Sequence, residues 1–272
     1  MTISLTSAMR SNLFALQQTA DQMDITQQRL ASGKKVNSAL DNPSSYFAAL
    51  GHNQRADALF ARKEAIGEAI QTTKKADEGI TAISKILEAA RGVLTSARAA
   101  VGDATKMAEL QAQFGSLMTQ LDNIVTDSAY KGVNLLNGGE LTVVLNENNT
   151  TEVTLEGFDA NNGGTVVTAT DVTWTGATVS ADLDTVEEAI NTSLSNLNTE
   201  ASKLAANLSV LQIRSDFITS SVNTLREGAD KLTLADLNEE GANMLMLQTR
   251  QQMSMAALSI SSQASSSILR LF

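Results

Sequence analysis

Two long stretches of the chain carry apolar residues at alternating steps of three and four, and this spacing constrains the fold more than any other feature. One stretch runs from Ile66 to Val101 and the other from Ile190 to Leu225. The spacing predicts helices with one buried seam near the heptad period of coiled coils. At about 1.5 Å per residue each helix would be on the order of 50 Å long, far above the average of about 11–12 residues. A shorter helix between them is expected to bury Met107, Leu110, Phe114, Leu117, Leu121 and Ile124.

Both ends of the chain repeat this pattern more sparsely. Near the start, the apolar residues that recur at helical spacing are Leu5, Met9, Leu13, Leu16, Met23 and Leu30. Near the end, the corresponding residues are Met244, Leu247, Met255, Leu258 and Ile268. Polar and small residues interrupt both stripes, so neither helix would be stable alone in water. Each helix needs the other, or copies of itself in neighbouring chains.

The period of the pattern changes between the two long helices. Segments 141–145, 150–155 and 165–173 are rich in Val and Thr and are separated by Asn- and Gly-rich turns. This composition predicts three strands. The expected fold is mainly α, an elongated coiled-coil or helical-bundle hairpin with paired N- and C-terminal helices. A small β region would lie at the distal end, opposite both termini.

A short segment after the first terminal helix carries the signals of a helix end and a turn. Gly33 is a C-cap candidate, because glycine adopts the left-handed conformation there without strain. Asn37 and Asp41 can form local side-chain hydrogen bonds, and Pro43 marks a break before the next helix.

Acidic charge is concentrated in the middle of the chain. No Lys or Arg lies between Gly132 and Ser202, whereas eleven Asp and Glu residues do. The net charge of −10 argues against nucleic acid or an anionic membrane as the main partner. No loop there has the alternating ligand spacing of a calcium site, so we interpret the acidic stretch as a solvated face.

The residues that most catalytic and metal sites require are scarce. The chain has no Cys and a single His, His52, and it contains no phosphate-loop, dinucleotide-loop or HExxH pattern. We therefore expect a protein that is not an enzyme, with no cofactor and no metal site. The first residues lack the basic lead and apolar block of a Sec-type signal peptide, and no apolar run is long enough to span a membrane.

Three segments, in this order along the chain, resemble signatures of bacterial flagellins. Residues 29–42 resemble the N-terminal signature, residues 129–136 the turn that enters the β region, and residues 242–272 the C-terminus. The resemblance covers roughly 1–137 and 186–272. It implies a structural subunit that self-assembles into the helical flagellar filament used for swimming motility.

The resemblance also implies a division into three domains. Residues 1–40 and 236–272 would form an inner coiled coil at the filament lumen, and residues 41–137 and 182–235 an outer helical core. Residues 138–181 would be a variable β-rich surface region, with Leu141–Ala181 dispensable for the filament tube. The two sparse terminal stripes would be polymerisation seams that neighbouring subunits bury.

The same resemblance suggests partners and a location. It implies an extracellular protein secreted unfolded through the flagellum's own type III-like channel, without a Sec signal. Its partners would be other copies of itself, the flagellar export apparatus, a flagellin chaperone, and the filament cap and hook-junction proteins. No nucleic acid or membrane partner is expected.

Flagellins of gut bacteria carry an Arg-x-Arg-Glu-Leu stretch and a nearby Glu that Toll-like receptor five recognises. Alignment on residues 130–133 identifies the equivalent positions as Ala89, Ala90, Arg91, Gly92, Val93 and Gln113. Only Arg91 keeps the residue type, and loss of the other charged groups removes anchoring contacts. We therefore expect a poor ligand for this receptor.

Three other classes of protein fit the sequence less well than a flagellin. A hook–filament junction protein of the same superfamily shares the terminal helices but would usually lack so complete a C-terminal signature. A chemoreceptor cytoplasmic hairpin predicts a membrane span and a helical tip, whereas this tip is rich in Thr, Val, Gly and Asn. An enzyme with its site in the middle segment lacks the residues for catalysis.

Overall fold

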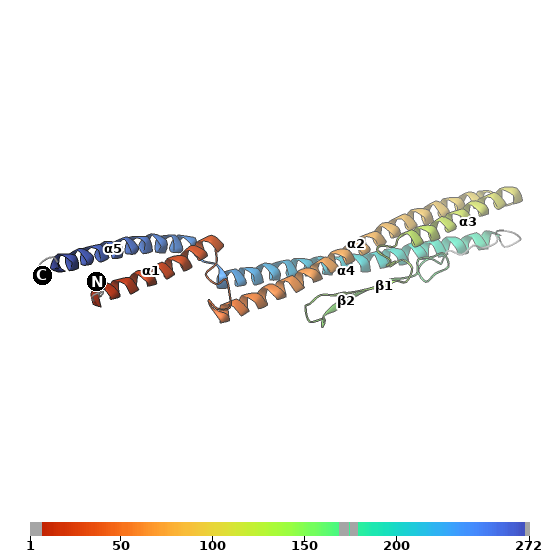
Figure 1. Ribbon diagram of the computed structural model, residues 1–272. Coiled ribbons are helices and arrows are strands. Elements are labelled where there is room, and N and C mark those ends of the chain that lie inside the picture. Colours follow the sequence, from red (N-terminus) through yellow and green to blue (C-terminus); the bar gives the residue numbers. More distant parts are fainter. Residues whose placement is uncertain (1–6, 169–173, 175–178, 270–272) are drawn as a thin grey trace. The chain divides into compact units, whose positions relative to one another are not determined.

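The computed structural model describes residues 7–168, 174 and 179–269 of the chain (Figure 1). This part contains five helices and a two-stranded sheet. Their order is α1 (Ser7–Ser32), α2 (Pro43–Ala99), α3 (Ala104–Asp127), β1 (Glu140–Val144), β2 (Glu152–Glu156), α4 (Val179–Thr233) and α5 (Leu237–Leu269). The predicted fold class, mainly helical with a small β region, is confirmed.

The chain divides into two compact units. One comprises residues 1–54 and 224–272, and the other residues 55–223. The helices α2 and α4 therefore contribute to both units. The three-domain division expected from the resemblance stays a prediction.

The ends of the helices follow from local capping chemistry. Pro43 is the first residue of α2, where its missing N–H costs nothing, and the Asn42 side chain accepts a hydrogen bond from Ser45 N at 3.1 Å. The Asp103 carboxylate caps α3 by accepting from Lys106 N at 3.2 Å. The break predicted at residues 42–43 is thus confirmed.

Both long helices bury most of the seams that their sequences predict, but Val101, the last residue of the first predicted seam, lies beyond the end of α2 and is exposed. In α4, buried residues recur every seven positions: Leu183, Ile190, Leu197, Leu204, Leu211 and Ile218. In α2, the fully buried large side chains include Ile66, Ile83, Leu87 and Leu94. These seams form the core of residues 55–223 together with α3.

The seam of α3 differs from the predicted one after Phe114. The structure buries Met118 and Val125, whereas Leu117 and Ile124 are half-buried. Leu110, also expected in the seam, is half-buried as well. The next buried position after Phe114 lies four positions along the chain, at Met118, rather than three, at Leu117, and Leu121 is buried as predicted.

The β region is a single antiparallel hairpin within the described residues. Strands β1 and β2 pair with Leu141 opposite Leu155 and Val143 opposite Val153, so the first two predicted strands are confirmed. The Asn146 side chain closes the turn by accepting a hydrogen bond from Thr150 N at 2.9 Å. This local bonding is typical of Asn in turns.

The third predicted strand is wrong where the structure describes it, over residues 165–168. Its backbone groups bond to a loop and to side chains of α4 instead of to a strand ladder. Val166 N donates to Asp159 O at 3.1 Å, and Thr168 N donates to Ser193 Oγ at 3.0 Å. The rest of the predicted strand, residues 169–173, lies outside the described residues.

Trp174 contributes the largest fully buried side chain in the described part of the chain. It is 1% exposed and packs on Phe114 of α3 with ring centroids 5.4 Å apart. Val166 and Val167 are buried as well. Part of the region expected to be dispensable therefore belongs to the helical core. No helix among the described residues is both long and apolar enough to cross a membrane.

Candidate assembly surface

Helices α1 and α5 pack side by side, and their shared seam is thin (Figure 1). The buried and half-buried positions of α1 follow a heptad pattern: Met9, Asn12, Leu16, Thr19, Met23, Thr26 and Leu30. Those of α5 are Glu240, Met244, Leu247, Gln251, Ser254, Leu258 and Ser261. Large apolar side chains occupy about half of these positions, so pairing of the two helices buries little apolar area.

Most of the residues expected to form polymerisation seams lie in this seam within one chain. They are Met9, Leu16, Met23, Leu30, Met244, Leu247 and Leu258. Leu13 and Met255 are exposed at its flanks. Leu5 lies outside the described residues, and so does the side chain of Ile268.

The faces of α1 and α5 that point away from the seam carry large exposed apolar side chains. We call this set the outer stripe, and its members are Phe14, Ile25, Leu245, Met246, Met253 and Ile260. Their exposures range from 49% to 70%. At about 100° per residue, all lie well over a quarter turn from the seam. The sequence analysis missed them, although the seven-residue spacing of Met246, Met253 and Ile260 was a usable signal.

An ion pair closes one end of the seam. Arg29 Nη1 lies 3.0 Å from Glu240 Oε1, and Glu240 is only 7% exposed. The Asp236 carboxylate caps the start of α5 by accepting from Asn238 N at 2.9 Å. Gly33 ends α1 with φ +69° and donates to Arg29 O at 2.8 Å, in the left-handed conformation expected of it.

The predicted signature turn is held together by one carboxylate. Asp41 Oδ2 accepts hydrogen bonds from Asn37 N and Ser38 N, both at 2.9 Å. These backbone donors hold the pKa of Asp41 below its ordinary value, because they stabilise the charged form. The turn leaves Leu40 almost fully exposed.

A second exposed apolar set lies on α4. Val210, Ile213 and Phe217 follow the three-then-four spacing of one helix face, and all three are exposed. This face points away from the buried seam of α4 that contains Leu211 and Ile218.

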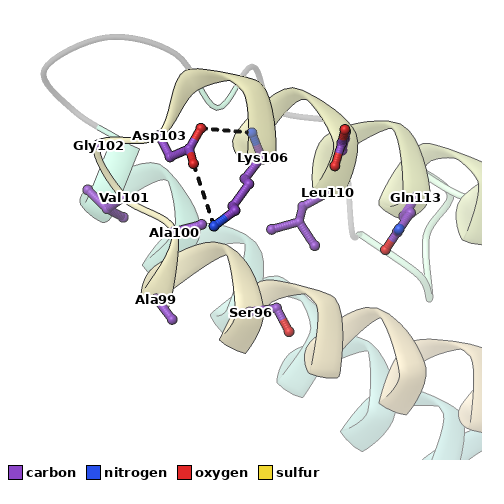
Figure 2. A pocket seen from close by; sticks show the side chains of 10 residues that line it. Ser96, Ala99, Ala100, Val101, Gly102, Asp103, Lys106, Leu110 and Gln113 are labelled. Carbon is purple, nitrogen blue, oxygen red and sulfur yellow. Dashed lines mark hydrogen bonds and ion pairs between the residues drawn. The ribbon is translucent and has the colours of Figure 1, made fainter.

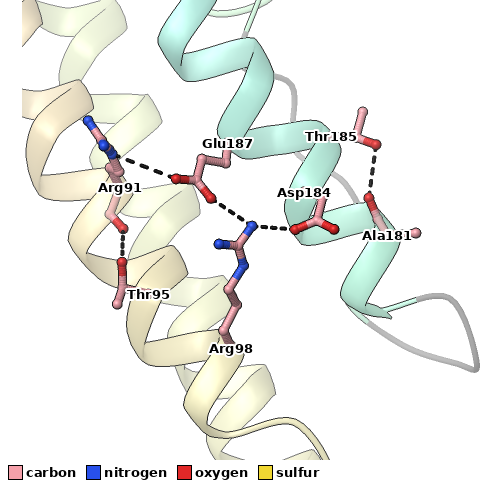
Figure 3. Close-up of polar contacts among 7 residues, drawn as sticks. All are labelled: Arg91, Thr95, Arg98, Ala181, Asp184, Thr185 and Glu187. Carbon is pink, nitrogen blue, oxygen red and sulfur yellow. Dashed lines mark hydrogen bonds and ion pairs between the residues drawn. The ribbon is translucent and has the colours of Figure 1, made fainter.

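Salt bridges join α2 and α4 near the receptor-equivalent positions (Figure 3). Arg98 pairs with Asp184 and lies 2.6 Å from Glu187, whose other carboxylate oxygen is 3.8 Å from Arg91 Nε. Glu187 thus pairs more closely with Arg98 than with Arg91.

The remaining receptor-equivalent positions differ in exposure. Ala89, Gly92 and Gln113 are exposed, Val93 is half-buried and Ala90 is fully buried. Side chains can therefore be exchanged at positions 89 and 92 without disturbing the core.

A groove of about 740 Å³ lies between the end of α2 and the start of α3 (Figure 2). Lys106 Nζ lies 3.6 Å from Asp103 Oδ2 in this groove, and Gln113 lines it as well. Asp103 is already engaged as the cap of α3. Among the described residues, no group of three His, Cys, Asp or Glu side chains could hold a metal ion.

Similarity to known proteins identifies the family to which this architecture belongs. Residues 2–140 match the model of the bacterial flagellin N-terminal helical region, and residues 183–272 match that of the C-terminal helical region. The chain is 27% identical to a flagellin of Brucella melitensis and 28% identical to the flagellin FljO of Caulobacter vibrioides. Each alignment covers 96% of this chain and 95% of the relative.

A solved structure shares the fold at low sequence identity. A putative flagellar hook-associated protein from Vibrio parahaemolyticus gives a TM-score of 0.55 at 13% identity, covering 71% of this chain and all of that one. Similarity to flagellins along almost the whole chain does not favour the hook–filament junction alternative. The chain belongs to the bacterial flagellin family and is a structural, self-polymerising subunit of the extracellular flagellar filament.

Proposed function

We propose that copies of this flagellin assemble by covering the outer stripe, while the seam between α1 and α5 forms within each copy. The observation that carries this proposal is the exposure of six large apolar side chains on the faces of both helices that point away from the seam. A second copy is the occupant that a self-polymerising family implies. Exposed apolar patches mark interaction sites, and four of these side chains share the outward side of α5.

The energetics support assembly as the step that stabilises these helices. Burial of a large apolar side chain contributes roughly 1.5–3 kcal/mol. The seam within one chain has few such residues, and the six of the outer stripe gain this contribution only in the filament. The paired terminal helices are then folded but marginal in the monomer, and polymerisation adds to their stability, as expected for sparse terminal stripes.

Two leucines on α5, two positions apart, allow the outer stripe and the seam to be tested independently. Leu245 belongs to the outer stripe, whereas Leu247 is 4% exposed in the seam. We expect Leu245→Asp to abolish filaments while the monomer keeps its helicity, because the carboxylate stays solvated until a neighbour covers it. Leu247→Asp should abolish filaments and also lower the helicity of the monomer, because a buried unpaired carboxylate costs several kcal/mol even in the monomer. Circular dichroism and negative-stain microscopy after salt-induced assembly measure the two effects.

Asn148→Asp provides the control for this experiment. It adds the same charge at an exposed position in the hairpin turn, and it should assemble normally. Normal filaments from the Leu245→Asp chain would show that the outer stripe is not an assembly surface.

Three further parts of the proposal concern the domains. We assign residues 1–40 and 236–272 to the inner domain, 41–137 and 182–235 to the outer domain, and 138–181 to the surface region. The start of α2 at Pro43 and the end of α4 at Thr233 lie close to two of these limits and support the assignment. The exposed set Val210, Ile213 and Phe217 supports contacts between the outer domains of neighbouring copies.

The hairpin should be dispensable for assembly, although removing it costs stability because Val143, Leu145 and Leu155 are buried. The segment that follows it should be needed for a stable core. Replacing residues 141–155 by a short turn is expected to leave filaments that are somewhat thinner. Trp174→Ala should lower the free energy of unfolding by roughly 3–5 kcal/mol, because it empties the site against Phe114. Microscopy and denaturant titration measure the two effects. Loss of all filaments on removing the hairpin would place it in a contact between subunits.

Export and accessory partners are also part of the proposal. We propose secretion of the unfolded chain through the flagellar type III-like channel, assisted by a flagellin chaperone, and delivery to the filament cap beyond the hook-junction proteins. Family membership supports this route. Terminal helices that are marginal before assembly would also ease passage through a narrow channel.

We further propose that this flagellin activates Toll-like receptor five poorly. Of the receptor-equivalent positions only Arg91 keeps its residue type, and its Nε lies 3.8 Å from Glu187 Oε1. Gln113 replaces the charged partner on α3.

A further inference from the structure

Six methionines of the described residues are either clearly exposed or clearly buried, while Met23 and Met244 are half-buried. On α5, Met246, Met253 and Met255 are 49–63% exposed, whereas Met9, Met107 and Met118 are 2–8% exposed. The exposed group is confined to 10 positions of one helix, and two of its members belong to the outer stripe. The buried group lies in the α1–α5 seam and in the core of α3.

These thioethers are the most readily oxidised side chains on that surface. The chain has no Cys that could compete for an oxidant. Hydrogen peroxide transfers one oxygen atom to the methionine sulfur, which loses two electrons, and the peroxide leaves as water. The product is methionine sulfoxide, a polar and chiral side chain in place of a flexible apolar one.

We propose that Met246, Met253 and Met255 form a modification site at which peroxide-type oxidants block assembly of the free subunit. This inference rests on the proposed function of the outer stripe. A sulfoxide oxygen on that stripe is solvated in the monomer, but a neighbouring subunit would cover it with apolar side chains. Burial of a polar group without a hydrogen-bond partner is unfavourable, so the oxidised chain polymerises poorly.

The same geometry makes the reaction depend on the state of assembly. Once a neighbour covers the outer stripe, Met246 and Met253 become as inaccessible as Met107 and Met118 already are in the core. Filaments then resist an oxidant dose that disables free subunits. The site thereby excludes damaged chains at the moment of incorporation.

The experiment treats purified monomer with a low dose of hydrogen peroxide and maps the added oxygen by peptide mass spectrometry. We expect sulfoxide at the three α5 methionines before Met107 or Met118, and a rise of about tenfold in the concentration needed for assembly. A variant carrying Met246→Leu, Met253→Leu and Met255→Leu keeps apolar side chains of similar volume. It should assemble and should not respond to the same dose.

Enzymatic reduction gives a second readout that needs no variant. Treatment of the oxidised monomer with a mixture of both methionine sulfoxide reductases should restore assembly, since sulfoxide formation is reversible. In preformed filaments, Met246 and Met253 should oxidise at least about tenfold more slowly than in monomers.

Three outcomes would overturn the inference. They are normal assembly of chains that carry the three sulfoxides, an equal loss of assembly in the Leu variant, and failure of the reductases to restore it. Each leaves the proposed function standing if Leu245→Asp still blocks filaments. If Met253 oxidises as fast in filaments as in monomers and Leu245→Asp also gives normal filaments, both this inference and the proposed function of the outer stripe are refuted.

Discussion

Deletion of α5, residues 237–272, should abolish filaments and also unfold α1, while residues 55–223 stay helical. In unit 1–54 plus 224–272, α1 packs on α5 along their whole seam. An isolated helix of 26 residues with so sparse an apolar face is marginal in water. The helical signal in circular dichroism should therefore fall by about 26 residues more than the deleted segment accounts for.

Hydrogen exchange should identify the residues that lose helical structure. Amides of α1 should exchange at the rate of an unfolded chain in the truncated protein, whereas amides of α4 around Leu197 and Leu204 should stay protected. Deletion of residues 141–155 is the matched control, since it shortens the chain but leaves both terminal helices intact. Filaments of normal width from the chain without α5 would contradict the assignment of the terminal helices to assembly.

Restoring three residues on α2 should convert a weak receptor ligand into a strong one. The triple variant Ala89→Arg, Gly92→Glu and Val93→Leu recreates the stretch that the receptor reads in flagellins of gut bacteria. Its effect should be at least about tenfold in potency, because a hot-spot residue contributes about 2 kcal/mol or more. A reporter-cell assay with purified monomer measures it.

The structure accommodates the substitutions at positions 89 and 92. A Cβ at Gly92 meets nothing within 4 Å, and Ala89 is exposed. Gly51→Glu is the control, because it replaces another exposed glycine of α2 that has nothing within 4 Å. Potency of the unmodified chain equal to that of an enteric flagellin would refute the prediction, and so would an equal gain from Gly51→Glu.

The helical architecture was predictable because its signal is repeated many times. The buried leucines and isoleucines of α4 recur every seven residues, so one misplaced residue does not obscure the period. The β1–β2 hairpin was predictable from composition, since segments rich in Val and Thr lie on both sides of an Asn-rich turn. Capping at Gly33 and Pro43 follows from backbone chemistry that each residue carries by itself.

The sequence predictions fail where a tertiary contact decides which residue is buried or which group binds the backbone. The pattern of α3 admits either Leu117 or Met118 in the seam, since both are large and apolar, and packing in the fold selects Met118. Residues 165–168 have strand-like composition, but the Ser193 hydroxyl and the Asp159 carbonyl take up their backbone donors. Sequence alone does not show these partners.

The candidate assembly surface illustrates the same limit. Apolar stripes on α1 and α5 were evident, but period alone does not say whether a stripe faces a helix of the same chain or of another chain. The structure assigns Leu16 and Leu247 to the first kind of contact and leaves Met253 and Ile260 exposed.

The seam between α1 and α5 has a consequence for how the two helices are aligned. Apolar residues on α1 repeat every seven positions from Met9 to Leu30, so α5 displaced by one heptad, about 10.5 Å, would meet nearly the same side chains. Such a shift would separate Arg29 from Glu240 and leave the Glu240 carboxylate, which is almost inaccessible to water, without its partner. The ion pair therefore holds the register together with two backbone hydrogen bonds, from Lys35 N to Thr233 O at 2.8 Å and from Ala235 N to Gly33 O at 3.0 Å. The length of the terminal pair is set at its base.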